Sequence, residues 1–181
     1  MSQPRIGLLG LGNLMRTDDA AGMLAVQQLV RDHDLPSHIV VVQGGTLGLD
    51  LLYSLEGVTH LLAIDAIEAG AAPGTILRFA NDETSHLPVS KSVHLLGFAD
   101  LVAALRLTGG VPWEVVVLGV QPEATGWGTE LTAAVRAAIP KLIHSALAEL
   151  GAWTTDLAAL HWPTVEFPRA QETRTNPIAE S

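Results

Sequence analysis

Four short apolar runs constrain the fold of this chain more than any other feature. They are RIGLLG (5–10), HIVVVQ (38–43), HLLAID (60–65) and EVVVLGV (114–120). Each run is apolar almost throughout, which is typical of strands buried on both faces of a parallel sheet. Helical patterns separate the runs. The sequence therefore predicts an α/β fold, a three-layer α/β/α sandwich with a mainly parallel twisted sheet.

Helical patterns occupy residues 19–33, 93–107 and 131–150. The second has its apolar residues on one helical stripe, formed by Leu95, Phe98, Leu101, Val102 and Leu105. In the third, Pro140 is expected to kink the helix, because proline lacks a backbone donor and clashes with the preceding turn. The segment 74–80, GTILRFA, predicts an extra edge strand, either parallel or antiparallel.

Length and composition indicate one domain with a tail. The 181 residues are 48% hydrophobic, enough for one well-buried core. We expect residues 1–150 to form a single α/β domain and residues 151–181 to form a tail without its own core. Because Trp153, Trp162 and Phe167 favour a surface to lie on, the tail is expected to pack on the body to about Phe167 and to be disordered beyond it.

Charge and cysteine content exclude several classes of function. Ten Lys+Arg against nineteen Asp+Glu give a net charge of -9, which disfavours binding to nucleic acid or to an anionic membrane. The absence of cysteine rules out disulfides, thiolate metal ligands and a thiol nucleophile. We find neither a bilayer-length apolar run nor a secretory signal pattern, so a cytoplasmic protein is expected.

The stretch LLGLGNLMRTDDAAG (8–22) begins like a nucleotide-binding turn and then departs from it. A dinucleotide site needs a third glycine where this chain has Met15. Asp18 and Asp19 stand near a helix N-terminus and would repel phosphate there. We therefore reject a nucleotide site. Asn13 is expected to bond to the backbone across this turn.

Three acidic or imidazole groups are expected near one edge of the sheet. One of Asp18 and Asp19 is enough to cap the following helix, which leaves the other to point into the crevice beyond the strand. Asp65 ends an apolar strand, although a simple turn residue is an equal alternative. His94 follows Ser92 at a helix start, where a neutral ring suited to metals is favoured; a structural histidine is the alternative.

Two carboxylates and an imidazole from three loops would form a facial set for a divalent transition ion, with open coordination positions. Spacing alone does not show that the three groups meet. The sequence contains no H-E-x-x-H motif and no G-x-S-x-G elbow, so zincin-type and serine-hydrolase chemistry have no support.

The motifs of this chain, in their order and approximate spacing, resemble the maturation endopeptidases of nickel-iron hydrogenases. The resemblance covers about residues 5 to 150 and rests on GLGNLMRTDDAAG, the GGT of QGGTLGLDLL, the IDAI around Asp65, PGTI, SVHLLGFADLVAALRLTG and LGVQPE. The family implies an α/β/α sandwich, in agreement with the pattern of strands and helices.

The resemblance also implies chemistry. Its metal ligands and catalytic groups match Asp19, Asp65 and His94, as in an aspartyl-type endopeptidase. The implied partner is the precursor of the nickel-iron hydrogenase large subunit, which loses a short C-terminal extension after nickel insertion. Cleavage in the family follows a His or Arg just beyond the last metal-binding cysteine motif. The nickel arrives with the substrate, and cadmium or zinc are other ions expected to fit.

This chain departs from the family at two positions. Many relatives have Glu where Asp19 stands, and many have an acid where Gln43 stands. Gly44, Gly45 and Thr46 are expected to bind substrate. The two glycines are placed in a loop whose backbone approaches it, and a plain turn needing positive φ is the alternative for them. Two other functions stay open: a general metal-dependent peptidase, and a nickel-binding chaperone or scaffold that does not cut. The oligomeric state is not predicted.

Overall fold

The computed structural model describes residues 4–46, 49–81, 84, 93–107, 112 and 114–154, with backbone alone for 93–96. Its centre is a five-stranded sheet with strand order β2-β1-β3-β5-β4. The strands are β1 (Ile6–Leu11), β2 (Ile39–Gly45), β3 (His60–Ala66), β4 (Ile76–Ala80) and β5 (Glu114–Val120). All neighbours pair in parallel except β4, which runs antiparallel to β5 at the edge. The α/β prediction and the edge strand are confirmed.

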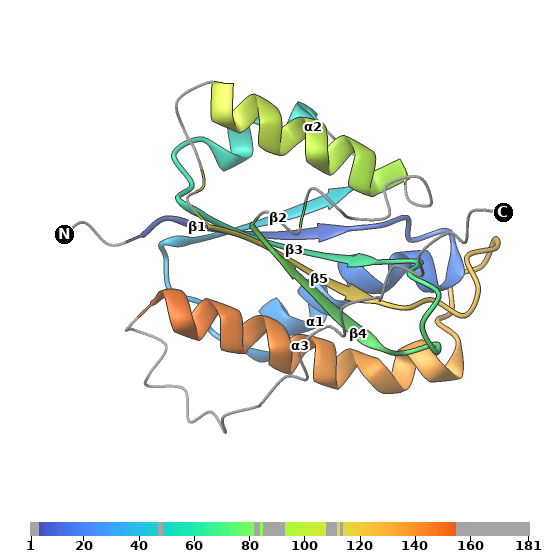
Figure 1. Ribbon diagram of the computed structural model, residues 1–181. Coiled ribbons are helices and arrows are strands. Elements are labelled where there is room, and N and C mark those ends of the chain that lie inside the picture. Colours follow the sequence, from blue (N-terminus) through green and yellow to red (C-terminus); the bar gives the residue numbers. More distant parts are fainter. Residues whose placement is uncertain are drawn as a thin grey trace, which may run out of the picture.

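Helices cover both faces of this sheet. They are α1 (Ala21–Asp32), α2 (Val93–Leu107) and α3 (Ala133–Trp153), with short 3-10 helices η1 (Thr17–Ala20), η2 (Leu49–Leu51) and η3 (Tyr53–Leu55). Figure 1 shows α1 and α3 together on one face and α2 on the other. The described part of the chain thus forms the expected three-layer sandwich, and it contains no helix long and apolar enough to cross a membrane.

The two faces of the sheet build two separate cores. Leu8 and Leu62 belong to the core beneath α1 and α3, whereas Leu9 and Leu61 belong to the core that includes Phe98 of α2. Successive residues of one strand point to opposite faces, so both faces must be apolar. This explains why the apolar runs are continuous, because β1 is buried at every position and β3 at every position but its first.

Several element boundaries differ from those expected. Strand β2 runs to Gly45, past Gln43, and the first helical segment divides into η1 and α1. The third helix continues to Trp153, past Leu150, with Pro140 inside it. Trp153 packs against the core, and its ring centroid lies 5.2 Å from that of His60. The expected arm from residue 155 onward, with its disordered end, lies outside the described residues.

Candidate active site at the carboxyl ends of β1 and β3

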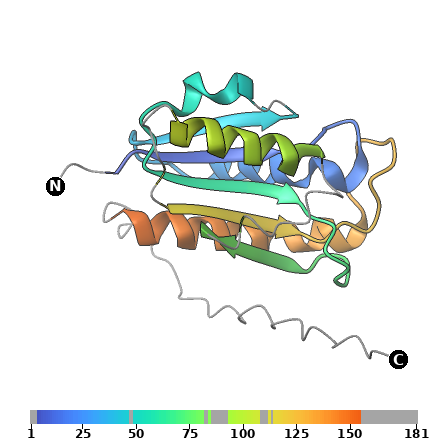
Figure 2. The same ribbon diagram turned by 45° about the horizontal axis from the view of Figure 1, so that its top comes forward.

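The strand order places one point of reversal in the sheet. The chain passes from β1 to β2 on one side of β1, and then to β3 on its other side. In open α/β sheets, ligands bind in the crevice at the carboxyl ends of the strands where the order reverses. Asp65 lies near the end of β3, and η1, with Asp18 and Asp19, follows β1. Figure 2 shows these strands pointing toward the same end of the molecule.

Two glycines allow the chain after β1 to lie directly on the strand ends. A Cβ on Gly22 would lie 2.5 Å from the carbonyl oxygen of Leu11 and would also meet that of Ile64. Gly12 has φ +119, and a Cβ there would meet the carbonyl oxygen of Asp19. These contacts require glycine, because any other residue would push η1 and α1 away from β1 and β3. The glycines therefore bring the acids after β1 close to the end of β3.

Asp18 is fully buried and joins η1 to the loop between β5 and α3. Its Oδ2 accepts hydrogen bonds from Glu123 N (2.9 Å), Ala124 N (3.0 Å) and Thr132 Oγ1 (2.9 Å). Its Oδ1 accepts one from Thr132 N at 2.7 Å. Neither Asp18 nor Asp19 caps η1 or α1, whose N-caps carry no side-chain hydrogen bond. The expected capping of the following helix by one of the two acids is therefore wrong.

Asp19 has a different environment. Its side chain is half-buried, and Oδ2 accepts a hydrogen bond of 3.2 Å from the backbone N–H of Asn13. Asn13 Oδ1 in turn accepts a hydrogen bond of 2.9 Å from the N–H of Met15, which confirms the expected side-chain bond across the turn. Of the two neighbouring acids, Asp18 is therefore enclosed by the β5–α3 loop. Asp19 lies against Gly12 and Asn13, which form the glycine turn after β1.

Asp65 is fully buried, and its Oδ1 accepts a hydrogen bond of 2.8 Å from the N–H of Ala66. A carboxylate in such a place needs donors, a cation or a proton to offset its lost hydration. Its position at the end of a central strand agrees with the expected place at the crevice rim. It differs from a turn residue, because β3 continues to Ala66.

His94 lies in the first turn of α2 by its backbone, and its side chain is outside the described set. Whether its ring meets Asp19 and Asp65 therefore stays a prediction. Within the residues that the structure describes, no group of three His, Cys, Asp or Glu side chains is arranged to hold a metal ion. The carboxylate oxygens at the strand ends fit a hard or borderline divalent ion in chemical type, and an imidazole would complete the facial set.

The two glycines of the GGT segment belong to the end of β2 rather than to a loop, which corrects our placement of them. A Cβ on Gly44 would meet the side chains of Leu9 and Leu51. Gly45 has φ +55, and its carbonyl oxygen accepts a hydrogen bond of 3.0 Å from Gly12 N. Thr46 follows in an exposed turn. Both glycines thus have a packing or backbone reason, and the predicted contact of the three residues with substrate is untested.

The loop between β5 and α3 flanks the same place, and the sequence did not identify it. Besides its bonds to Asp18, this loop makes two hydrogen bonds to the segment after β1. Arg16 Nε donates to Thr125 O (2.9 Å), and Gly128 N donates to Met15 O (3.0 Å). Trp127 is 82% exposed on this loop and Met15 is 57% exposed on the facing one. Its sequence signals were the end of the LGVQPE motif and a tryptophan between two glycines, and we assigned neither of them to the site. Exposed Trp and Met on well-held loops are typical of binding surfaces.

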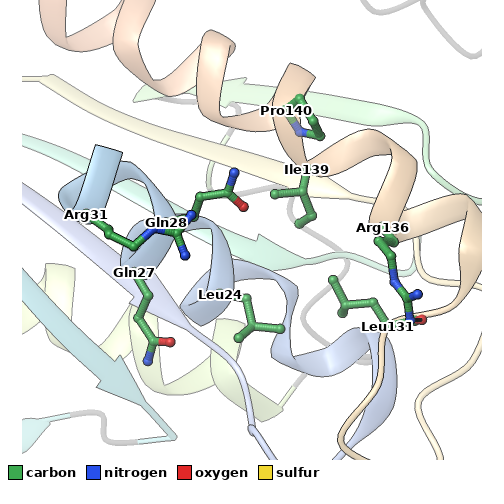
Figure 3. A pocket seen from close by; sticks show the side chains of 8 residues that line it. All are labelled: Leu24, Gln27, Gln28, Arg31, Leu131, Arg136, Ile139 and Pro140. Carbon is green, nitrogen blue, oxygen red and sulfur yellow. Dashed lines mark hydrogen bonds between the residues drawn. The ribbon is translucent and has the colours of Figure 1, made fainter. Parts of the chain in front are cut away.

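One cavity of about 490 Å³ opens elsewhere, between α1 and α3 (Figure 3). It is lined by Leu24, Gln27, Gln28, Arg31, Leu131, Arg136, Ile139 and Pro140. None of the predicted ligands lines it. The donor chemistry at the strand ends therefore identifies the candidate site better than the size of this cavity does.

Comparisons with known proteins show the family of this chain. The sequence pattern of the family HycI, hydrogenase maturation protease, matches residues 23–149. The hydrogenase 2 maturation protease of Escherichia coli K12 is 38% identical over 148 residues, covering 81% of this chain and 90% of that protein. The hydrogenase expression/formation protein HupD of Bradyrhizobium diazoefficiens is 33% identical over 168 residues, covering 91% and 88%.

Solved structures show the same fold. The hydrogenase maturating endopeptidase HybD from E. coli has a TM-score of 0.78 at 37% identity, covering 82% of this chain and 93% of that one. The [NiFe] hydrogenase maturation protease HybD from Thermococcus kodakarensis has a TM-score of 0.68 at 25% identity, covering 81% and 98%. On its matching sequence, relatives and fold, the chain belongs to the hydrogenase maturation protease family.

Proposed function

We propose that this protein is an endopeptidase that removes a C-terminal extension from the nickel-loaded precursor of a nickel-iron hydrogenase large subunit. The observation that carries the proposal is the position of two acids at the reversal point of the sheet in a chain of this family. Asp65 lies near the end of β3, and Asp19 lies on η1, whose backbone packs against Gly12 just after β1. Peptide hydrolysis needs a group that positions water and a group that polarises the scissile carbonyl, and this edge offers acids for both tasks.

Substrate-bound nickel would be recognised by Asp19, Asp65 and His94. Ligands of this kind without a thiolate hold a free ion only moderately, because water completes the coordination shell. Affinity would rise when the ion comes attached to substrate cysteines, so the metal acts as a mark of a correctly loaded precursor. Asp19, half-buried beside the turn, is the carboxylate suited to orient the attacking water.

The surroundings of the site support a protein-sized substrate. Leu14, Met15 and Trp127 are exposed on the two loops that flank Asp19, and backbone hydrogen bonds hold these loops together. Large apolar side chains on rigid loops lose little conformational entropy when a partner covers them. A peptidase for short peptides would have less use for such a surface.

Intact mass spectrometry tests the proposal directly. Wild-type protein is incubated with nickel-loaded and with nickel-free precursor, and we expect a shortened product from the loaded form only. Asp19→Ala, Asp65→Asn and His94→Ala should remain folded and yield no product. Asp50→Ala is the matched control, because Asp50 is an exposed acid on η2 and should leave processing unchanged.

The other two functions give different results in the same assay. A nickel chaperone or scaffold would bind the precursor and leave its mass unchanged. A general metal-dependent peptidase would hydrolyse short peptides after addition of zinc or manganese, without any precursor. Normal processing by all three site variants would disprove the assignment of Asp19, Asp65 and His94.

A further inference from the structure

We propose that Asp18 is a positioning residue, which fixes Asp19 by tying η1 to the loop between β5 and α3. This inference rests on the proposed function, in which Asp19 is a site carboxylate. Asp18 itself is fully buried and acts through its neighbour rather than on substrate.

The hydrogen bonds of Asp18 are directed at one distant segment. All four come from Glu123, Ala124 and Thr132, more than a hundred positions along the chain. Four donors around one buried carboxylate hold it in a single orientation. Thr132, which precedes α3, donates through both its N–H and its hydroxyl, so the start of α3 is fixed to η1 as well.

The short helix that carries both acids depends on this anchorage. Helix η1 spans only Thr17–Ala20, and its N-cap, Arg16, makes no side-chain capping bond. Further contacts attach η1 itself to the same loop: Thr17 Oγ1 donates to Ala124 O at 2.6 Å, and Asp18 N donates to Ala124 O at 3.1 Å. The position of η1 is therefore set largely from outside, by the β5–α3 loop.

Asp19 is the next residue in the chain and bonds to the glycine turn on the other side. If η1 shifts, Asp19 shifts with it relative to Asp65, whose position is fixed in β3. Because a displacement of about 1 Å in a catalytic group can reduce the rate about a hundredfold, loss of the Asp18 anchor should reach the reaction. A residue that only stabilised the fold would lower the free energy of unfolding without this local effect.

The test compares Asp18→Asn with Glu149→Gln in the full chain. Asn keeps the shape of Asp18, but its NH₂ group donates and so faces N–H or O–H groups that donate to a carboxylate oxygen in the wild type. Glu149 is a matched control because it is also a buried carboxylate, held by Arg78 at 2.6 and 3.1 Å, on the far part of α3. Chemical denaturation establishes how much stability each variant loses.

Two readouts separate positioning from stability. The first is hydrogen exchange at the amides of Ala20, Ala124 and Thr132, and the second is calorimetric titration with cadmium ion alone. We expect Asp18→Asn to exchange faster at these amides and to bind cadmium about tenfold more weakly, the scale on which outer partners of ligands act. Glu149→Gln, at equal loss of stability, should match wild type in both. On nickel-loaded precursor, kcat should fall for Asp18→Asn more than KM rises.

Wild-type exchange and cadmium affinity in Asp18→Asn would overturn the inference, and so would equal losses in Glu149→Gln. A wild-type protein that does not cut the precursor would defeat the proposed function and leave the Asp18 assignment to the exchange data. If wild type takes up no cadmium, faster exchange at Ala20 in Asp18→Asn alone supports the anchor, and unchanged exchange there refutes it.

Discussion

Gly22→Ala should destabilise the protein even though alanine is the better helix former. The added Cβ would lie 2.5 Å from the carbonyl oxygen of Leu11 and would also meet that of Ile64, where ordinary contact needs 3.4–4 Å. Both obstacles are backbone atoms of central strands, so they do not move aside as side chains do. Overpacking of this kind costs about 3 kcal/mol. The higher helix propensity of alanine offsets about 1 kcal/mol of this cost, so the free energy of unfolding should fall by about 2 kcal/mol.

Equilibrium urea denaturation of Gly22→Ala measures that loss, and thermal melting should show a Tm lower by about 4–8 °C for a protein of this size. Gly151→Ala is the control, because Gly151 is an exposed glycine of α3 with nothing within 4 Å of its added Cβ. That variant should be neutral or more stable by up to about 1 kcal/mol. If Gly22→Ala were as stable as wild type, the close seating of α1 on β1 and β3 would be refuted.

Two further variants test other side-chain contacts of the described structure. Arg78→Met removes a bidentate partner from Glu149, which is 10% exposed by its side chain, and should lower the free energy of unfolding by about 2 kcal/mol in urea titration; an unchanged midpoint would contradict a role for this pair. Gln121→Leu should cost about 2 kcal/mol, because Gln121 Oε1 accepts the N–H groups of Ala69 and Ala71 at 2.9 and 3.1 Å. Hydrogen exchange at those two amides should quicken, and protection equal to wild type would contradict the predicted role.

The sequence predicted the layers of the fold because the strands obey a simple physical rule. Strands buried on both faces must be apolar at every position, and β1, β3 and β5 are buried almost throughout. The predicted apolar stripe of α2 is also confirmed for its described side chains. They are buried in one core and are Phe98, Leu101, Val102 and Leu105. These features depend on local pattern alone, and local pattern is what a single sequence displays.

Element ends were less predictable because tertiary contacts set them. Gly44 and Gly45 were expected in a loop, as glycine usually is, but they extend β2. Gly44 has no room for a side chain beside Leu9 and Leu51, and the sequence does not reveal this neighbour. The continuation of α3 to Trp153 has a similar cause, since Trp153 packs against the core and the ring of His60.

The division of work between Asp18 and Asp19 illustrates what a single sequence does and does not determine. Two adjacent acids at a helix start indicated that one has a structural task and the other is available to the site, but nothing local distinguishes them. The partners that enclose Asp18 lie at residues 123, 124 and 132 and become its neighbours only through the order of the sheet. If these four hydrogen bonds went to Asp19 instead, Asp19 would be the buried anchor, and the local sequence pattern would look the same. The resemblance to the family selected Asp19 as the ligand, and the independent finding that Asp18 is enclosed leaves Asp19 as the acid of the pair that can serve the proposed site.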